Sequence, residues 1–188
     1  IFALFYVEVG GLHGARPGSF ADAYYFSVQT LGTVGYGSVY PVSVGANLIV
    51  LPELANSGYV FRSRDEAFAL AEEVPVGGTT AAWIEAACRH NVYIVAGIAE
   101  RAGSSLYNSA VVVGPSGHIG TFRKVHLWAA ENLFFEPGDL GFPVFKTPIG
   151  RIGVAICYDG WFPETFRLQA LQGADVVCVP TNWVPIPG

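Results

Sequence analysis

The sequence is poor in charged residues. Only 13% of its 188 residues are Asp, Glu, Lys or Arg, and 52% are hydrophobic, whereas a soluble domain usually carries about 25% charged residues. Intrinsic disorder needs the opposite balance and is excluded. Ten basic residues against fifteen acidic ones leave a net charge of −5, which gives a nucleic-acid-binding role no electrostatic support.

Cysteine and long apolar runs are also scarce. Three cysteines are an odd and low number, which argues against a disulfide scaffold. No uninterrupted apolar run approaches the roughly 18 residues that a membrane-spanning helix needs. The four histidines, His13, His90, His118 and His126, lack the spacing of metal ligands, so we expect neither a metal nor another cofactor.

The few charges are distributed unevenly along the chain. Residues 1–46 contain only Glu8, Arg16 and Asp22, and they are dense in aromatic residues and glycine. Residues 47–188 contain all the other charges and alternate strand-like with helix-like runs, which predicts an α/β fold with helices packed on a sheet. We therefore predict two parts, 1–46 and 47–188, with no linker between them.

Periodicity and turn residues predict the elements of the second part. Asp65 is expected to cap a helix over 65–73, and residues 114–117 to join two strands as a hairpin. In a helix over 79–90, four residues are expected to face the core: Ala82, Ile84, Ala87 and Cys88. The remaining predictions are a helix over 163–171 that ends near Gly173 and strands over 48–51, 92–99, 109–113, 119–123, 152–156 and 175–179.

Three reactive side chains each follow a predicted strand. Glu53, Lys124 and Cys157 can therefore converge at one edge of a sheet. A thiolate nucleophile needs a base and a positive neighbour, and a carboxylate and an ammonium group supply both. Each residue also has a purely structural interpretation: a solvated strand end, a surface lysine and an inert buried thiol.

The phrases around these residues are LPELANSGY (51–59), FRKVHL (122–127) and CYDGWFPE (157–164). They resemble the carbon–nitrogen hydrolase, or nitrilase, superfamily from about residue 45 to residue 188. The resemblance implies a partial α-β-β-α sandwich, a Glu–Lys–Cys triad of Glu53, Lys124 and Cys157, and a second active-site glutamate at Glu131, with Glu136 as its competitor. It also implies metal-free hydrolysis of a small amide, carbamoyl amine or nitrile, and assembly into a homo-oligomer.

In the amide case Cys157 attacks the carbonyl carbon, and the backbone N–H of Tyr158 and the ammonium of Lys124 hold the oxyanion. Glu53 passes a proton to the leaving ammonia, and water then hydrolyses the thioester. Packing in the core is the alternative role for the candidate pocket residues, which are Tyr59, Trp161, Asn182 and Trp183.

The three cysteines are expected to differ in reactivity. Cys157 is predicted to be the one thiol that iodoacetamide alkylates rapidly near neutral pH. Cys88 and Cys178 are predicted to react slowly, because they fall on an apolar helix face and in a buried strand.

Residues 33–37 read Thr33-Val34-Gly35-Tyr36-Gly37 and follow a helix-length apolar stretch at 19–30. Glycine permits a backbone whose carbonyls coordinate a cation. The segment resembles the pore loop of potassium channels, most of all the prokaryotic inward rectifiers. The resemblance implies that Thr33, Val34, Gly35, Tyr36 and Gly37 form a selectivity filter for potassium ions, after a pore helix and within a tetramer.

Neither resemblance covers a whole family member. The pore segment lacks two complete membrane helices, so no potassium conduction is expected. The hydrolase part lacks the first strand and helix of its fold and about a third at its C-terminal end, which predicts impaired activity. We therefore expect a chimera in which a cytoplasmic thiol hydrolase follows a pore segment that would be membrane-bound only if complete. The rival interpretations are a potassium-pore fragment and a non-functional chimera.

Overall fold

The computed structural model describes residues 12–13, 40–41 and 47–182. The chain divides into two compact units, Ile1–Ile49 and Val50–Gly188. In the first unit β1 (Leu12–His13) pairs antiparallel with β2 (Tyr40–Pro41). The predicted pore helix at 19–30 and the predicted filter Thr33–Gly37 lie outside the described residues.

The first large sheet has the strand order β3-β4-β5-β6, with bounds Leu48–Val50, Tyr93–Ala102, Ser105–Gly114 and Gly117–Arg123. Strands β4, β5 and β6 run antiparallel, and the turn between Gly114 and Gly117 confirms the predicted hairpin. Strand β4 continues past the predicted end at Ala99, because the Glu100 carboxylate is buried against Arg123 and Ser109. An ion pair thus allows a charged residue inside the sheet.

The second sheet has the order β7-β8-β9, with bounds Val144–Thr147, Gly150–Val154 and Val176–Cys178. Strands β8 and β9 are parallel, and the connection between them contains α5 (Pro163–Leu171). The predicted bounds of α5 are confirmed. Proline suits the first turn of a helix, where its missing N–H costs nothing, and Gly173 follows the helix with φ +83°.

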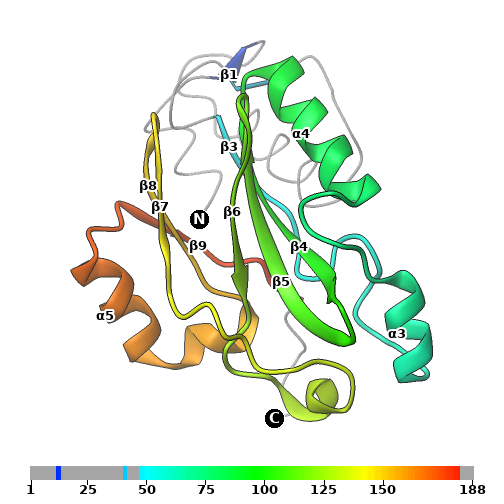
Figure 1. Ribbon diagram of the computed structural model, residues 1–188. Coiled ribbons are helices and arrows are strands. Elements are labelled where there is room, and N and C mark those ends of the chain that lie inside the picture. The colour runs from blue at the N-terminus through cyan, green and yellow to red at the C-terminus, as the bar shows by residue number, and fades with distance from the viewer. Residues whose placement is uncertain (1–11, 14–39, 42–46, 183–188) are drawn as a thin grey trace. The chain divides into compact units, whose positions relative to one another are not determined.

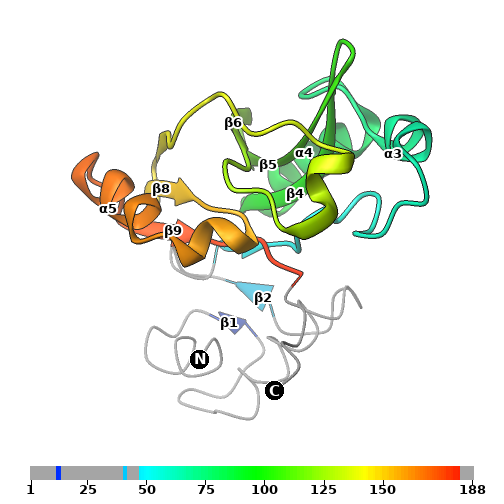
Figure 2. The ribbon, with the colours of Figure 1, turned by 90° about the horizontal axis from the view of Figure 1, so that it is seen from below.

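The two sheets face each other between helices (Figures 1 and 2). Helix α4 (Gly78–His90) covers the outer face of β4, β5 and β6, and α5 covers the outer face of the second sheet. At the interface, a Cβ on Gly120 of β6 would lie 2.2 Å from the Phe145 ring of β7. The α-β-β-α arrangement confirms the fold class predicted for the second part of the chain.

Helix α3 (Arg64–Leu70) starts and ends earlier than predicted. Asp65 as its N-cap was wrong: the Ser63 side chain accepts a hydrogen bond from Glu66 N at 3.1 Å and caps the helix. The helix stops before Ala71, which takes an extended conformation. Glu72 then forms a bridge with Glu100, so a tertiary strand contact ends the helix.

The predicted core face of α4 was largely wrong. Ala82 and Cys88 are exposed and Ile84 is half-buried, whereas Thr80 and Ala87 are buried. Each residue turns about 100° around a helix, so burial of Ala87 directs the next residue, Cys88, toward solvent. The expected burial of Cys178 in β9 is confirmed, at 4% exposure.

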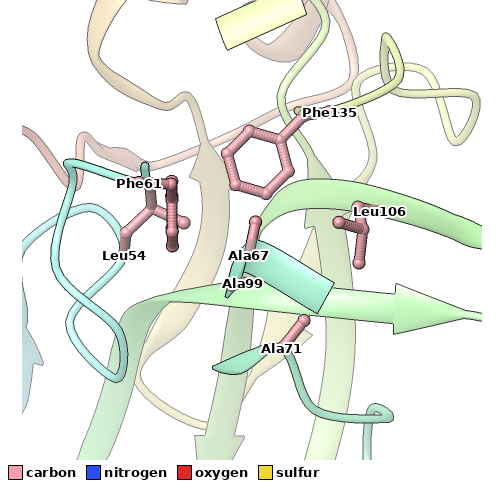
Figure 3. Packing of buried hydrophobic residues seen from close by; sticks show 7 residues of the cluster. All are labelled: Leu54, Phe61, Ala67, Ala71, Ala99, Leu106 and Phe135. Atoms are coloured by element: carbon pink, nitrogen blue, oxygen red, sulfur yellow. The ribbon is translucent and has the colours of Figure 1, made fainter. Parts of the chain in front are cut away.

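A buried cluster fixes the loop between β3 and α3 (Figure 3). Phe61 and Phe135 meet edge to face with ring centroids 5.7 Å apart, a favourable aromatic geometry. The cluster anchors the segment after Glu53 on β4, β5 and α3. Its members are Leu54, Phe61, Ala67, Ala71, Ala99, Leu106 and Phe135.

None of the helices in the described ranges combines the length and the apolarity needed to cross a bilayer.

The backbone of Gly97 in β4 lies against the Glu53 segment, and a substitution at position 97 tests this packing. A Cβ at position 97 would lie 2.5 Å from Glu53 Cα and 2.5 Å from Pro52 O. We expect Gly97→Ala to lower the free energy of unfolding by about 1–3 kcal/mol, the usual cost of overpacking, measured by urea denaturation. Gly78→Ala is the control, since its Cβ would meet nothing within 4 Å. Equal stability of the two variants would contradict the close approach.

Candidate active site

The Glu53 side chain is held where the chain leaves β3 and runs along β4. The backbone is fixed by Gly97 N, which donates to Pro52 O at 3.1 Å, and by Ala55 N, which donates to Gly97 O at 2.9 Å. The carboxylate is fully buried. Its Oε1 accepts hydrogen bonds from Asn108 Nδ2 at 2.8 Å and Lys124 Nζ at 2.6 Å.

Lys124 follows β6, and its ammonium group lies between two glutamates. The side chain is fully buried, and Nζ lies 2.6 Å from Glu53 Oε1 and 2.7 Å from Glu131 Oε1. Its backbone is tied on both sides: Lys124 N donates to Asn108 O at 2.8 Å, and Gly138 N donates to Lys124 O at 2.8 Å. The ammonium is therefore a fixed positive charge inside the fold.

Glu131 occupies the position beside Lys124, and its competitor Glu136 does not. Glu131 lies in a 3₁₀ turn, Ala129–Leu133. Its Oε1 accepts hydrogen bonds from Lys124 and from the Tyr59 hydroxyl, and its Oε2 accepts from Trp128 N at 3.0 Å. Glu136 is exposed and pairs with Arg64 at 3.3 Å.

Cys157 follows β8 at a strained turn. Its φ is +44°, a conformation that costs a non-glycine residue about 1–3 kcal/mol. Cys157 N donates to Pro180 O at 3.0 Å, which holds the turn against the end of β9. The side chain is 9% exposed.

The charges of the cluster set the protonation of the thiol. Burial, together with the negative charge and hydrogen bond of Glu53, raises the pKa of Cys157 to about 12, and the Lys124 ammonium lowers this pKa only in part. Burial also raises the pKa of Glu53, which makes that carboxylate a stronger base. Burial opposes the charge on Lys124, but the two glutamates raise the pKa of Lys124 above its usual value.

The predicted pocket residues take different places. Tyr59 binds Glu131, and burial and that bond raise the pKa of Tyr59. Asn182 holds Glu53: its Nδ2 donates to Glu53 O at 2.6 Å and its N donates to Glu53 Oε2 at 3.2 Å. Trp161 is 51% exposed, and Trp183 lies outside the described residues.

Tyr158, the predicted backbone donor, directly follows Cys157. Its ring meets Trp128 edge to face at 4.7 Å, and Trp161 lies 5.8 Å from the same ring. An aromatic group therefore borders the turn that carries the thiol.

Two polar residues that contribute hydrogen bonds to the site were not predicted from the sequence. Asn108 binds both the Glu53 carboxylate and the backbone of Lys124. Its position directly before the predicted strand 109–113, in the phrase YNSAVVV, was the available signal. Asp159 joins the segments of Lys124 and Cys157 through His126, and no periodic pattern marks that contact.

Comparison with known proteins places the chain in a family. The family model described as carbon-nitrogen hydrolase matches residues 28–187, so the chain belongs to the carbon–nitrogen hydrolase family. It is 54% identical over 140 residues to a nitrilase of Pyrococcus abyssi, covering 74% of this chain and 53% of that protein. The chain spans about half the length of the curated relatives it matches.

Two solved structures share the fold. The carbon-nitrogen hydrolase from Helicobacter pylori G27 matches with a TM-score of 0.68 and 28% identity over 93% of this chain and 59% of its own. A glutamate-to-glutamine mutant of the amidase from Nesterenkonia sp. matches with a TM-score of 0.58 and 25% identity, over 73% and 54% of the two chains. That structure shows the result of Michael addition of acrylamide at the active-site cysteine.

A second family model, described as ion channel, matches residues 1–54. The two matches overlap between residues 28 and 54. They confirm both resemblances stated from the sequence and are consistent with a chimera.

The buried ammonium gives a direct test of the cluster. Lys124→Met removes the cation between Glu53 and Glu131 and keeps an apolar stem. Breaking a buried ion pair in this way costs about 3–5 kcal/mol of unfolding free energy, which we expect at pH 8. Without the cation the folded state favours protonated carboxyls, so their folded pKa values rise above the unfolded ones. The deficit against the wild type should therefore shrink as the pH falls toward 5.

The matched control is Lys146→Met, which makes the same change at an exposed position and should alter stability by less than about 0.5 kcal/mol. Urea denaturation at pH 5 and pH 8 measures both variants. A pH-independent deficit in Lys124→Met would contradict the charge assignment.

Proposed function

We propose that the second part of the chain, residues 47–188, hydrolyses a small non-peptide C–N bond through Cys157, Glu53 and Lys124. The observation that carries the proposal is the buried Lys124 ammonium, 2.6 Å from Glu53 and 2.7 Å from Glu131. A fixed cation beside a thiol and a carboxylate suits a reaction that develops negative charge on a substrate oxygen.

The mechanism begins with a neutral thiol. Because burial and Glu53 raise the pKa of Cys157 to about 12, sulfur does not attack as a stored thiolate. Glu53 takes the proton as the Cys157 sulfur bonds to the carbonyl carbon, and the C=O electron pair moves onto oxygen. Glu53 Oε1 already holds two donors, whereas Oε2 receives a longer bond from Asn182 N at 3.2 Å, which favours Oε2 as the proton acceptor.

The later steps use the same groups. The Lys124 ammonium and the backbone N–H of Tyr158 stabilise the oxyanion. The C–N bond breaks as Glu53 returns its proton to the departing amine or ammonia, leaving a thioester on Cys157. Glu53 then removes a proton from water, whose oxygen attacks the thioester carbon and releases the acid and the thiol.

Glu131 fits a supporting role in this scheme. Three donors, Lys124 Nζ, the Tyr59 hydroxyl and Trp128 N, bind its two carboxylate oxygens. A carboxylate engaged in this way orients Lys124 better than it accepts a proton. We assign Glu131 to the site as the residue that orients the Lys124 ammonium group.

The substrate class stays open among a small amide, a carbamoyl amine and a nitrile. The relatives are called nitrilase and N-carbamoylputrescine amidase, and acrylamide adds to the active-site cysteine in a glutamate-to-glutamine mutant of a related amidase. Aliphatic amides are therefore the first substrates to test. A homo-oligomer is the expected assembly.

Replacing the base separates proton transfer from thiol reactivity. Glu53→Gln should lower amide turnover by about 10²–10⁴-fold, the usual contribution of a general base. It should also lower the pKa of Cys157, because the negative Glu53 is one of the groups that raise it. Acrylamide should therefore still add to Cys157, as mass spectrometry would show, while ammonia release is lost.

Glu136→Gln serves as the control, since Glu136 is an exposed carboxylate outside the cluster and its loss should leave turnover unchanged. Full turnover by Glu53→Gln, or by Cys157→Ala, would refute the assignment.

A potassium-selective pore segment is the second candidate, favoured by the ion-channel match to residues 1–54. Its filter would be Thr33–Gly37 and its active form a tetramer. Potassium flux from vesicles reconstituted with the chain is the measurement. Flux that depends on Gly35 and Gly37 would support this candidate, and its absence would leave the hydrolase as the function of the chain.

A further inference from the structure

A single buried carboxylate connects the segment of Lys124 with the turn that carries Cys157. Asp159 Oδ1 accepts hydrogen bonds from His126 N at 2.9 Å and from His126 Nδ1 at 2.8 Å. Its Oδ2 accepts from Ile156 N at 3.1 Å. The carboxylate is fully buried, so these bonds are its compensation for leaving water.

Ring stacking also holds the imidazole of His126 in place. It stacks on Phe162 with centroids 3.7 Å apart and planes 11° apart, and Phe142 lies 6.3 Å away on a near-parallel plane. The Nδ1 atom therefore presents its proton to Asp159 in one orientation. Neither His126 nor Asp159 is among the groups that bind Glu53, Lys124 or Glu131 described above.

The turn at Cys157 needs such an anchor. A φ of +44° at a cysteine persists only where the surrounding structure imposes it. Asp159 fixes the residue before the cysteine, through Ile156 N, and Pro180 O fixes the cysteine N–H itself. Loss of the first bond would let the turn relax toward an ordinary conformation and move the sulfur away from Glu53.

We propose that His126 and Asp159 form a positioning pair, which holds the Cys157 turn in register with the Lys124 segment. The proposal deepens the proposed function and rests on it, because it concerns the geometry of the same nucleophile. Both residues act through Cys157 and Lys124 and not on the substrate.

Two variants separate the hydrogen bond from the ring stack. His126→Phe keeps an aromatic ring against Phe162 and removes the Nδ1 donor. His126→Asn keeps an N–H donor near the Nδ1 position and removes the ring. The measurement is the rate of Cys157 alkylation by iodoacetamide between pH 7 and pH 10, followed by mass spectrometry of the folded protein.

The wild-type rate should be low near neutral pH and rise throughout this range, because the pKa of Cys157 is raised to about 12; this differs from the rapid alkylation expected from the sequence. Among the described residues, Glu53, Lys124 and Glu131 act on the protonation of the thiol, and the Tyr59 hydroxyl also interacts with it. In His126→Phe we expect the Cys157 sulfur to move away from these charged groups. The alkylation rate should then level off near pH 9, close to the ordinary pKa of a cysteine. His126→Asn should keep the wild-type profile, which a purely stabilising role of the ring would not predict.

The other two cysteines are internal controls. Cys88 is exposed and should show one unchanged profile in all three proteins. Cys178 is buried and should stay unlabelled while the fold is intact. Labelling of Cys178 in both variants would assign the pair to folding alone and overturn the proposal.

The remaining outcomes distinguish failure of the positioning pair from failure of the proposed function. A wild-type rate that already levels off near pH 9 would refute the neutral-thiol step of the proposed mechanism, together with the placement of Cys157 beside Glu53 that the pair is proposed to maintain. A rising wild-type profile with the same profile in His126→Phe would refute the positioning pair and leave the proposed function standing.

Discussion

The buried ammonium of Lys124 is the interaction on which the rest of the site depends. Moving a lysine charge out of water costs several kcal/mol unless well-placed partners compensate for it. Glu53 and Glu131 supply those partners at 2.6 and 2.7 Å. They come from segments far apart in the sequence, so the charge can be buried only when the loop after β3, the exit of β6 and the 3₁₀ turn at Ala129–Leu133 meet. Formation of the fold and assembly of the site are therefore one event.

The same cluster explains why the thiol stays neutral. One ammonium faces two carboxylates, so the field at Cys157 is more negative than a simple lysine–cysteine pair would give. The sequence predicted a base and a positive neighbour for the sulfur, and both are present. In the proposed reaction, their balance favours proton transfer to Glu53 during attack over a stored thiolate, because burial and Glu53 together outweigh Lys124 in setting the pKa of Cys157.

Local sequence signals predicted elements well where the chain itself supplies the boundary. Pro163 and Gly173 bracket α5, and glycines mark the hairpin between β5 and β6. The approach of Glu53 and Lys124 was also predictable, since each follows a strand of the first sheet. The expected single sheet edge was wrong for Cys157, which follows β8 of the second sheet. Cys88 was misplaced because helix periodicity alone does not show which face meets the sheet. The contact between His126 and Asp159 joins residues 33 positions apart, and no local pattern specifies it.

The chain matches two family models, and the hydrogen bonds of the site can be located relative to them. The donors and acceptors that hold Glu53, Lys124, Glu131 and Cys157 lie between residues 52 and 182, from Pro52 O to Asn182 N. The last of these reaches back across 129 positions to Glu53. Among the described residues, these bonds join the first segment of the site, at Pro52 and Glu53, to its last, at Asn182. The proposed hydrolysis therefore requires contact between the loop after β3 and the segment after β9, because Asn182 holds both the backbone and the carboxylate of Glu53.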